Sequence, residues 1–224
     1  MVEAARKEEK LMSAKASSDV FEYRNLMLVA ELDASSAERL FTIGQLVAET
    51  CDPVYIDAFW IPAEHLHVKI LDLGRVREDL VDLVAKKMKA EFEEMAPIPL
   101  AYGDFELYSE DPNPVEALWV KVPDEGGGLA QARKTAALIL SEMENGEGFL
   151  SDVDSELPFH LPLALFNKFR DTREFGGAIT SRDPKVIDGI TLGELVLMDY
   201  TDARSRKNSP FQAVDRFNLE KKEQ

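Results

Sequence analysis

The sequence predicts an α+β fold, and three observations support it. Runs of strand length outnumber the three segments in which a helix is expected. The expected order of elements is β-α-β-β-α-β-β-α-β-β-β, so strands and helices do not alternate regularly along the chain. The 224 residues are 45% hydrophobic and 30% charged, which is enough for one large domain or two small lobes with a real core.

The first expected strand, 25–32, is a nearly continuous apolar run of the kind that is buried on both faces. We expect a helix directly after it, with Ser35 as N-cap and Glu38 completing a capping box. Two more helices are expected over 75–95 and from 126 to 143, the second opened by three glycines that match no phosphate-loop spacing. The remaining strands are expected at 54–60, 66–73, 99–108, 115–122, 159–166, 191–200 and 211–219.

The charge is strongly acidic and unevenly distributed. The formal net charge is −16 and the isoelectric point about 4.6. Residues 160–224 hold 11 basic and 10 acidic side chains, whereas residues 1–159 hold 15 basic and 32 acidic ones. This balance argues against long nucleic acid or an anionic membrane as a partner, and any phosphate contact must be local.

The number of cysteines indicates the kind of compartment in which this protein is expected. The single cysteine, Cys51, cannot form an internal disulfide or a cysteine-based zinc site, so a reducing, intracellular compartment, most simply the cytoplasm, is expected. No apolar run is long enough for a membrane span. We expect residues 1–20 to be a charged tail and residues 21–224 to form the domain.

The three histidines are the most informative polar residues. His67 and His160 lie in apolar, strand-like runs with similar surroundings, whereas His65 is expected in a loop. A period of two places His67 on one strand face with Lys69, and His160 on one face with Pro162. The ordinary alternative is a pair of buried structural histidines.

The run from His67 to Gly74, HVKILDLG, and the run that begins at His160, HLPLAL, resemble the two motifs of the 2H phosphoesterase superfamily. This superfamily includes the LigT-like RNA ligases and cyclic phosphodiesterases and the phosphoesterase-like domain of A-kinase anchor protein 7. The glycine seven residues after His67 fits the first motif, and the strand pattern of 190–199 and 211–219 is similar to the family's closing hairpin.

The resemblance implies two pseudo-symmetric lobes, each an antiparallel or mixed sheet with helices on its outer face, and a cleft between them. It implies that His67 and His160 act as general base and general acid, without a metal or other cofactor. It also implies a ligand class: an RNA end, a 2′,3′-cyclic nucleotide or a 2′-5′ linked oligonucleotide.

The chain departs from the family's motifs at three positions. Lys69 and Pro162 stand where the family has the hydroxyl residues that hold the phosphate. Lys69 still offers a cation, but Pro162 has neither a side-chain donor nor a backbone N–H, and a proline within a strand predicts an edge or a bulge. Asp72 replaces a phenylalanine of the first motif, and strict alternation places it on the face opposite His67.

Several other candidate site residues also have an ordinary structural explanation. His65 and His67 have only His160 as a further nitrogen ligand, so we expect no metal site. Arg204 and Arg206, with Lys207 beside them, are either a solvated loop or a local cation cluster for a nucleotide phosphate. Four aromatic residues either stack a base or belong to the core: Trp60, Tyr102, Tyr108 and Trp119.

Two functional hypotheses follow. The first is a phosphoesterase of the 2H type, weakened by the loss of both motif hydroxyls. The alternative is a catalytically inactive subunit on the same scaffold that binds a nucleotide or a protein partner. The retained pair His67 and His160 favours the enzyme, whereas Lys69 and Pro162 favour the alternative.

Overall fold

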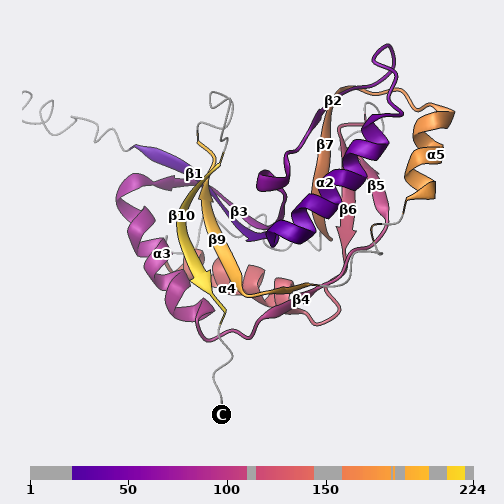
Figure 1. Ribbon diagram of the computed structural model, residues 1–224. Helices are drawn as coiled ribbons and strands as arrows, with labels where there is room; N and C mark the ends of the chain where they lie inside the picture. The colour runs from indigo at the N-terminus through magenta and orange to yellow at the C-terminus, as the bar shows by residue number, and fades with distance from the viewer. Residues whose placement is uncertain are drawn as a thin grey trace, which may run out of the picture.

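The computed structural model describes residues 22–109, 115–143, 158–182, 184, 190–201 and 211–219 of the chain. The expected tail, residues 1–20, and the cation cluster Arg204, Arg206 and Lys207 lie outside the described residues. Two four-stranded sheets with helices packed against them form two lobes (Figure 1). The predicted α+β class is confirmed.

The first sheet has the strand order β10-β9-β1-β3, and neighbouring strands are antiparallel. Its strands are β1 (Tyr23–Glu31), β3 (His67–Arg77), β9 (Glu194–Asp199) and β10 (Gln212–Asn218). The central strand β1 is buried over Leu26–Ala30 because both of its faces are covered, as its apolar run predicted. The histidine-bearing strand β3 lies at the edge of this sheet.

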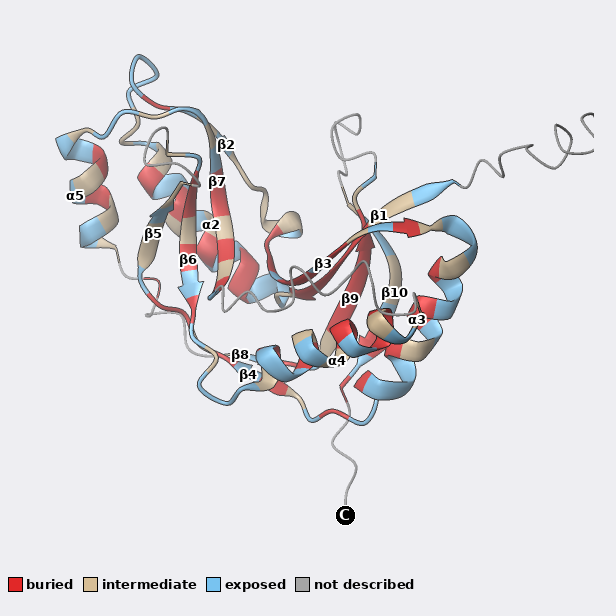
Figure 2. Ribbon diagram, turned by 180° about the vertical axis from the view of Figure 1, so that it is seen from behind, coloured by how far each residue is buried: buried red, intermediate tan, exposed pale blue. Residues whose placement is uncertain are grey.

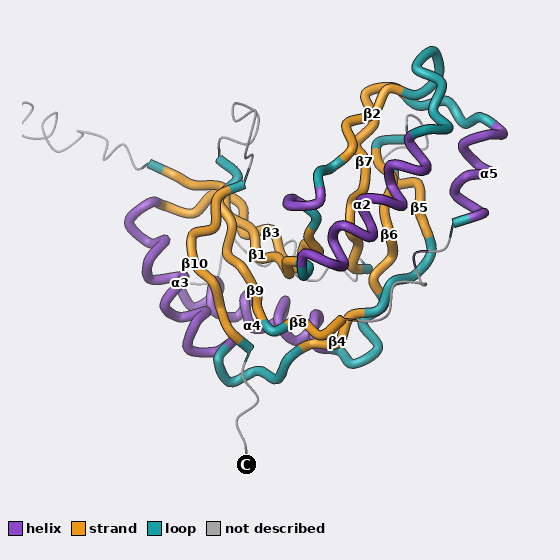
Figure 3. The backbone as a smooth tube through the Cα atoms, viewed as in Figure 1, coloured by secondary structure: helices purple, strands orange, loops and turns teal. Residues whose placement is uncertain are grey.

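The second sheet has the order β2-β7-β6-β5 and is also antiparallel. Its strands are β2 (Asp57–Trp60), β5 (Phe105–Tyr108), β6 (Ala117–Val122) and β7 (Phe159–Lys168). A two-stranded ribbon of β4 (Ile98–Leu100) and β8 (Ile190–Leu192) lies where the chain passes between the lobes (Figure 3).

Four α-helices are described: α2 (Ala34–Ala48), α3 (Glu78–Phe92), α4 (Gly128–Met143) and α5 (Arg173–Ser181). Helices α3 and α4 pack against the first sheet, and α2 packs against β2 and β7 of the second. None of the described helices is long and apolar enough to cross a membrane.

Aspartate carboxylates accept hydrogen bonds at the starts of two helices, and at the first of them the sequence prediction was different. The N-cap of α2 is Asp33, whose carboxylate accepts from the Ser36 N–H at 3.0 Å, so the predicted Ser35 cap is wrong. The carboxylate of Asp124 accepts from two N–H groups in the first turn of α4. Asp124 thus occupies the N-terminus of α4, where a phosphate loop would place its anion.

One apolar core holds the two lobes together. It includes Leu26 and Leu28 of the first sheet, Val120 and Leu161 of the second, and Leu129 of α4, all 0% exposed. Figure 2 shows the buried residues running along the central strands and the inward sides of the helices. Because this core crosses between the sheets, it determines how the two histidine-bearing strands lie relative to each other.

Candidate functional site

Strands β3 and β7, which carry His67 and His160, contact each other where the two lobes meet. Arg133 of α4 spans this contact. Its Nε donates to the Ile70 carbonyl oxygen of β3 at 2.8 Å, and its guanidinium lies 3.9 Å from the centre of the Phe159 ring of β7. The two strands are thereby held together one residue from His160 and three residues from His67.

His67 is a buried imidazole with a defined tautomer. Its side chain lies at the start of β3, the residue is 7% exposed, and Nδ1 lies 2.8 Å from the carbonyl oxygen of His65. A carbonyl only accepts, so Nδ1 carries the proton of the neutral ring and Nε2 carries the lone pair. Burial lowers the pKa of His67. The ring is therefore neutral at pH 7 and suited to accept a proton.

Lys69 lies on the same face of β3 as His67, as predicted. The cross-strand partners show this, because His67 pairs with Glu31 and Lys69 pairs with Val29 on β1. The Lys69 side chain is exposed, whereas its neighbours Val68 and Ile70 are buried.

The predicted position of Asp72 is wrong. A β-bulge sets Lys69 opposite Val29 and Leu71 opposite Leu28, so one extra residue of β3 lies between these pairs. The alternation shifts by one, and Asp72 joins the face of Lys69. There its Oδ1 accepts from the Tyr200 hydroxyl at 2.9 Å.

Glu31 and Arg216 belong to the same face, although sequence reasoning singled out neither. Glu31 lies directly across from His67. Arg216 of β10 binds Glu31 Oε2 at 2.7 Å and Glu194 Oε2 at 2.6 Å. This cation offsets two carboxylates that would otherwise repel an anion near His67. In the sequence, Arg216 is a single arginine in the last expected strand. Only the pairing of the strands shows that Glu31 and Glu194 are its partners.

His160 is bonded to a carboxylate. Its Nε2 lies 2.9 Å from Oε2 of Glu106, and Oε1 of Glu106 lies 3.5 Å from Nζ of Lys121. The three residues come from adjacent strands, since His160 pairs with Lys121 and Trp119 pairs with Glu106. Sequence reasoning missed Glu106 and Lys121, because nothing local connects them with His160.

Three rings stand side by side across β5, β6 and β7. The Tyr108 and Trp119 rings stack at 3.8 Å with an angle of 13°, and the Trp119 and His160 rings are 4.4 Å apart with an angle of 44°. The strand β6 that carries Trp119 lies between β5, which carries Tyr108, and β7, which carries His160. Trp119 thus contacts the imidazole, and Tyr108 stacks on its indole ring.

The other aromatic candidates lie elsewhere. Tyr102 is 4% exposed and belongs to the core, and burial raises its pKa to about 12. The Trp60 ring lies next to Gly44 of α2, where an added Cβ would be 3.5 Å from Cε3 of the ring. Neither ring is available as a stacking platform at the histidines.

Pro162 lies in a central strand, not at an edge, and it adjoins a bulge. The register shifts between Leu118, paired with Ala164, and Trp119, paired with Pro162. The bulge alternative of the prediction is therefore confirmed. His160 and Pro162 share one face, as predicted, because their partners Lys121 and Trp119 do.

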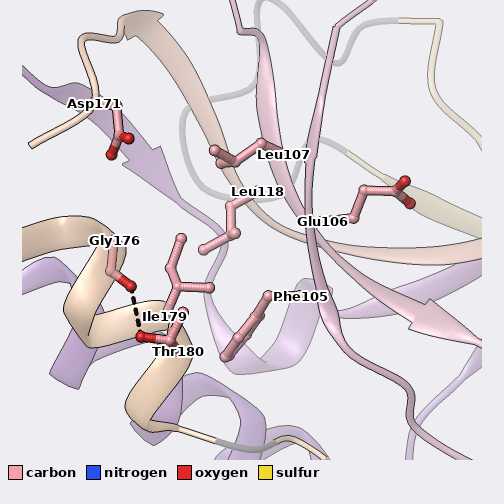
Figure 4. A pocket seen from close by; sticks show the side chains of 8 residues that line it. All are labelled: Phe105, Glu106, Leu107, Leu118, Asp171, Gly176, Ile179 and Thr180. Atoms are coloured by element: carbon pink, nitrogen blue, oxygen red, sulfur yellow. Dashed lines mark hydrogen bonds between the residues drawn. The ribbon is translucent and has the colours of Figure 1, made fainter. Parts of the chain in front are cut away.

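A shallow hollow of about 400 Å³ lies on the other side of the second sheet, between β5 and α5. Figure 4 shows Phe105 and Ile179 at this hollow, whereas the carboxylate of Glu106 points away from it. The hollow is therefore separate from the face that carries His160.

His65 ends a short 3-10 helix, Ala63–His65, that leads into β3, as the loop expectation implied. Its carbonyl oxygen, not its ring, is the group that accepts from His67. Within the described residues, no cluster of three or more His, Cys, Asp or Glu side chains is placed to hold a metal ion.

No family model and no curated protein matches this sequence. Solved structures match over most of the chain. Escherichia coli LigT complexed with 3′-AMP is 16% identical with a TM-score of 0.65, and the match covers 89% of this chain and 100% of LigT. A protein described as a phosphoesterase is 16% identical with a TM-score of 0.66, over 88% of this chain and 99% of its own.

A protein of Thermus thermophilus is 16% identical with a TM-score of 0.63, over 87% of this chain and 97% of its own. The chain therefore has the LigT-like fold that the two histidine motifs predicted.

Proposed function

We propose that this chain is a phosphoesterase-like domain that binds a small phosphate ester at His67, Lys69 and His160. The observation that carries the proposal is the state of His67. Its ring is buried and neutral, its Nε2 lone pair is the basic nitrogen, and a lysine follows two residues later on the same strand face. The second histidine lies on a strand that contacts this one.

The two histidines have different roles. His67 Nε2 takes the proton from the attacking water as its oxygen bonds to phosphorus. His160, with both ring nitrogens protonated, donates its Nδ1 proton to the leaving oxygen as the other P–O bond breaks, while its Nε2–H stays bonded to Glu106. Lys69 balances the charge on the phosphoryl oxygens.

The ligand class is a small phosphate ester. LigT has been crystallised with phosphate, 3′-AMP, ATP and NADP+, and this chain has the LigT-like fold. For this chain we propose a 2′,3′-cyclic nucleotide, a 2′-5′ linked oligonucleotide or the end of a short RNA. Lys69, as one cation beside His67, suits one phosphate better than a long chain of phosphates.

We expect slow turnover. A positioned donor to the developing charge is worth ~10²–10³ in rate. Lys69 supplies a flexible cation in place of a fixed hydroxyl, and Pro162 supplies no donor from its side chain or its backbone.

Hydrolysis of 2′,3′-cyclic AMP by the purified protein tests the proposal. His67→Ala and His160→Ala should each abolish turnover, since each histidine serves a separate proton transfer. His65→Ala, which keeps the backbone carbonyl that His67 uses, is the matched control and should retain activity. Lys69→Thr combined with Pro162→Thr should raise the rate by restoring the hydroxyls.

The alternative is a non-catalytic nucleotide-binding or assembly subunit. Two observations favour it: Pro162 adjoins a bulge next to the motif, and Glu106 occupies His160 Nε2. Binding of 3′-AMP without turnover of the cyclic nucleotide, in both the wild type and the double revertant, would establish this alternative and exclude the enzyme.

A further inference from the structure

The carboxylate of Glu106 lies between two donors on the face of the second sheet that carries His160. One oxygen lies 2.9 Å from His160 Nε2 and the other 3.5 Å from Lys121 Nζ. An imidazole N–H and an ammonium around one anion are groups that would also bind a phosphate oxygen. A ligand at His160 therefore meets a negative charge that is part of the protein.

We propose that Glu106 makes this site selective for singly charged phosphodiesters over doubly charged phosphomonoesters. The inference rests on the proposed function and names its substrate class. The repulsion between a carboxylate and a ligand is proportional to the ligand's charge, so a dianion is disfavoured twice as strongly as a monoanion at the same position.

The His160 imidazole that binds Glu106 is held in place by neighbouring rings. Trp119 pairs with Glu106 across β5 and β6, and Tyr108 stacks on Trp119 at 3.8 Å. Trp119 in turn contacts His160 at 4.4 Å, so the imidazole cannot turn away from Glu106 without losing this contact. The imidazole therefore presents its Nε2 to the Glu106 carboxylate in the folded protein.

The charge of Glu106 also acts on the product of the reaction. Hydrolysis of a cyclic phosphodiester converts a monoanion into a monoester that is a dianion above its second pKa of about 6. The carboxylate that tolerates the substrate therefore repels the product, which favours product release.

Lys69 attracts both ligand classes, again in proportion to their charge. The absolute preference of the wild type for either ligand is therefore not the test. The test is the change that follows when the Glu106 charge alone is removed. Glu106→Gln keeps the shape of the side chain and also releases Lys121 from its ion pair. Both effects act on a ligand in proportion to its charge.

The experiment measures dissociation constants for 2′,3′-cyclic AMP and 3′-AMP at pH 8, by adding each ligand to the protein until the Trp119 indole resonance stops shifting. The spectra with the cyclic ligand are recorded before its slow hydrolysis becomes detectable. If Glu106→Gln tightens binding of the cyclic monoanion about threefold, it should tighten binding of 3′-AMP by about the square, roughly tenfold. Glu106→Ala should shift the ratio in the same direction. Glu116→Gln, an exposed carboxylate just before β6, removes the same formal charge and should leave both constants unchanged.

A ¹⁵N spectrum of the His160 ring in the absence of ligand checks the underlying contact. The wild type should show the proton on Nε2, and Glu106→Ala should lose that preference. Binding of both ligands with an unchanged ratio in Glu106→Gln would overturn this inference and leave the proposed function intact. No binding of either ligand, by wild type or variant, would overturn both.

Discussion

Arg133 donates a 2.8 Å hydrogen bond from Nε to the backbone carbonyl oxygen of Ile70. The donor lies on α4 and the acceptor on β3, and the same guanidinium covers the Phe159 ring of β7. One side chain thus connects a helix with the two strands that carry His67 and His160. Its burial lowers the pKa of Arg133, although the guanidinium remains charged.

Replacement of this arginine should destabilise the protein. Arg133→Met keeps most of the apolar stem but leaves the Ile70 carbonyl without this donor, which should cost about 2 kcal/mol in the free energy of unfolding. Urea denaturation measures the loss. Lys134→Met, an exposed neighbour on the same helix, is the matched control and should change stability by less than about 0.5 kcal/mol. Equal losses of unfolding free energy in the two variants would show that the Arg133 contacts do not hold β3 and β7 together.

His67 should make stability depend on pH. Burial lowers its folded-state pKa below the ordinary 6.5, so the unfolded chain binds a proton that the folded chain rejects. Stability from this group is complete above about pH 6.5 and is lost as the pH falls from there toward the folded-state pKa. The slope in that window is at most about 1.4 kcal/mol per pH unit.

His67→Gln should therefore flatten the curve of unfolding free energy between pH 7.5 and 5, measured by urea denaturation at each pH. His65→Gln is the control and should keep the wild-type slope. Parallel curves for the wild type and His67→Gln would contradict a buried neutral imidazole at this position.

Gly74 and Gly177 should respond to alanine in opposite directions. Gly74 has φ of 63°, in the left-handed region, so Gly74→Ala should cost about 1 kcal/mol. Gly177 lies inside α5, where an added Cβ would meet no neighbouring atom within 4 Å, so Gly177→Ala should stabilise the protein by roughly 0.5–1 kcal/mol. Melting temperatures of the two variants should shift in opposite directions. Shifts in the same direction would contradict the left-handed backbone conformation of Gly74 or the helical one of Gly177.

Long nucleic acid should not bind. Residues 1–159 hold 32 acidic and 15 basic side chains, so phosphates beyond the histidines meet carboxylates. We expect no shift of long single-stranded RNA in a gel at physiological salt. Tight binding that grows with RNA length would refute the charge argument.

A small ligand should behave differently. Binding of 3′-AMP should be lost in Lys69→Ala and should weaken in the wild type as ionic strength rises, because the attraction of an exposed lysine is screened. Lys168→Ala, an exposed lysine at the far end of β7, is the control and should bind as the wild type does. Salt-independent binding would assign the affinity to other groups.

Local patterns in the chain were sufficient for most of the architecture. Continuous apolar runs predicted β1 and β7, and helical spacing predicted α2 and α3, because burial selects the same periodicity that the sequence displays. Helix α5 was not predicted. It has only nine residues and two adjacent glycines, and its stability comes from the buried Phe175 and from the Thr172 cap.

The sequence by itself determined that His67 and Lys69 share a strand face, and that His160 shares one with Pro162, because alternation along a strand is a local property. Only the tertiary structure decided where Asp72 lies, because a bulge in β3 depends on the pairing with β1. Only the tertiary structure brought Glu106 to His160, across 54 residues of chain, because cross-strand neighbours are chosen by the register of the sheet and not by proximity in sequence.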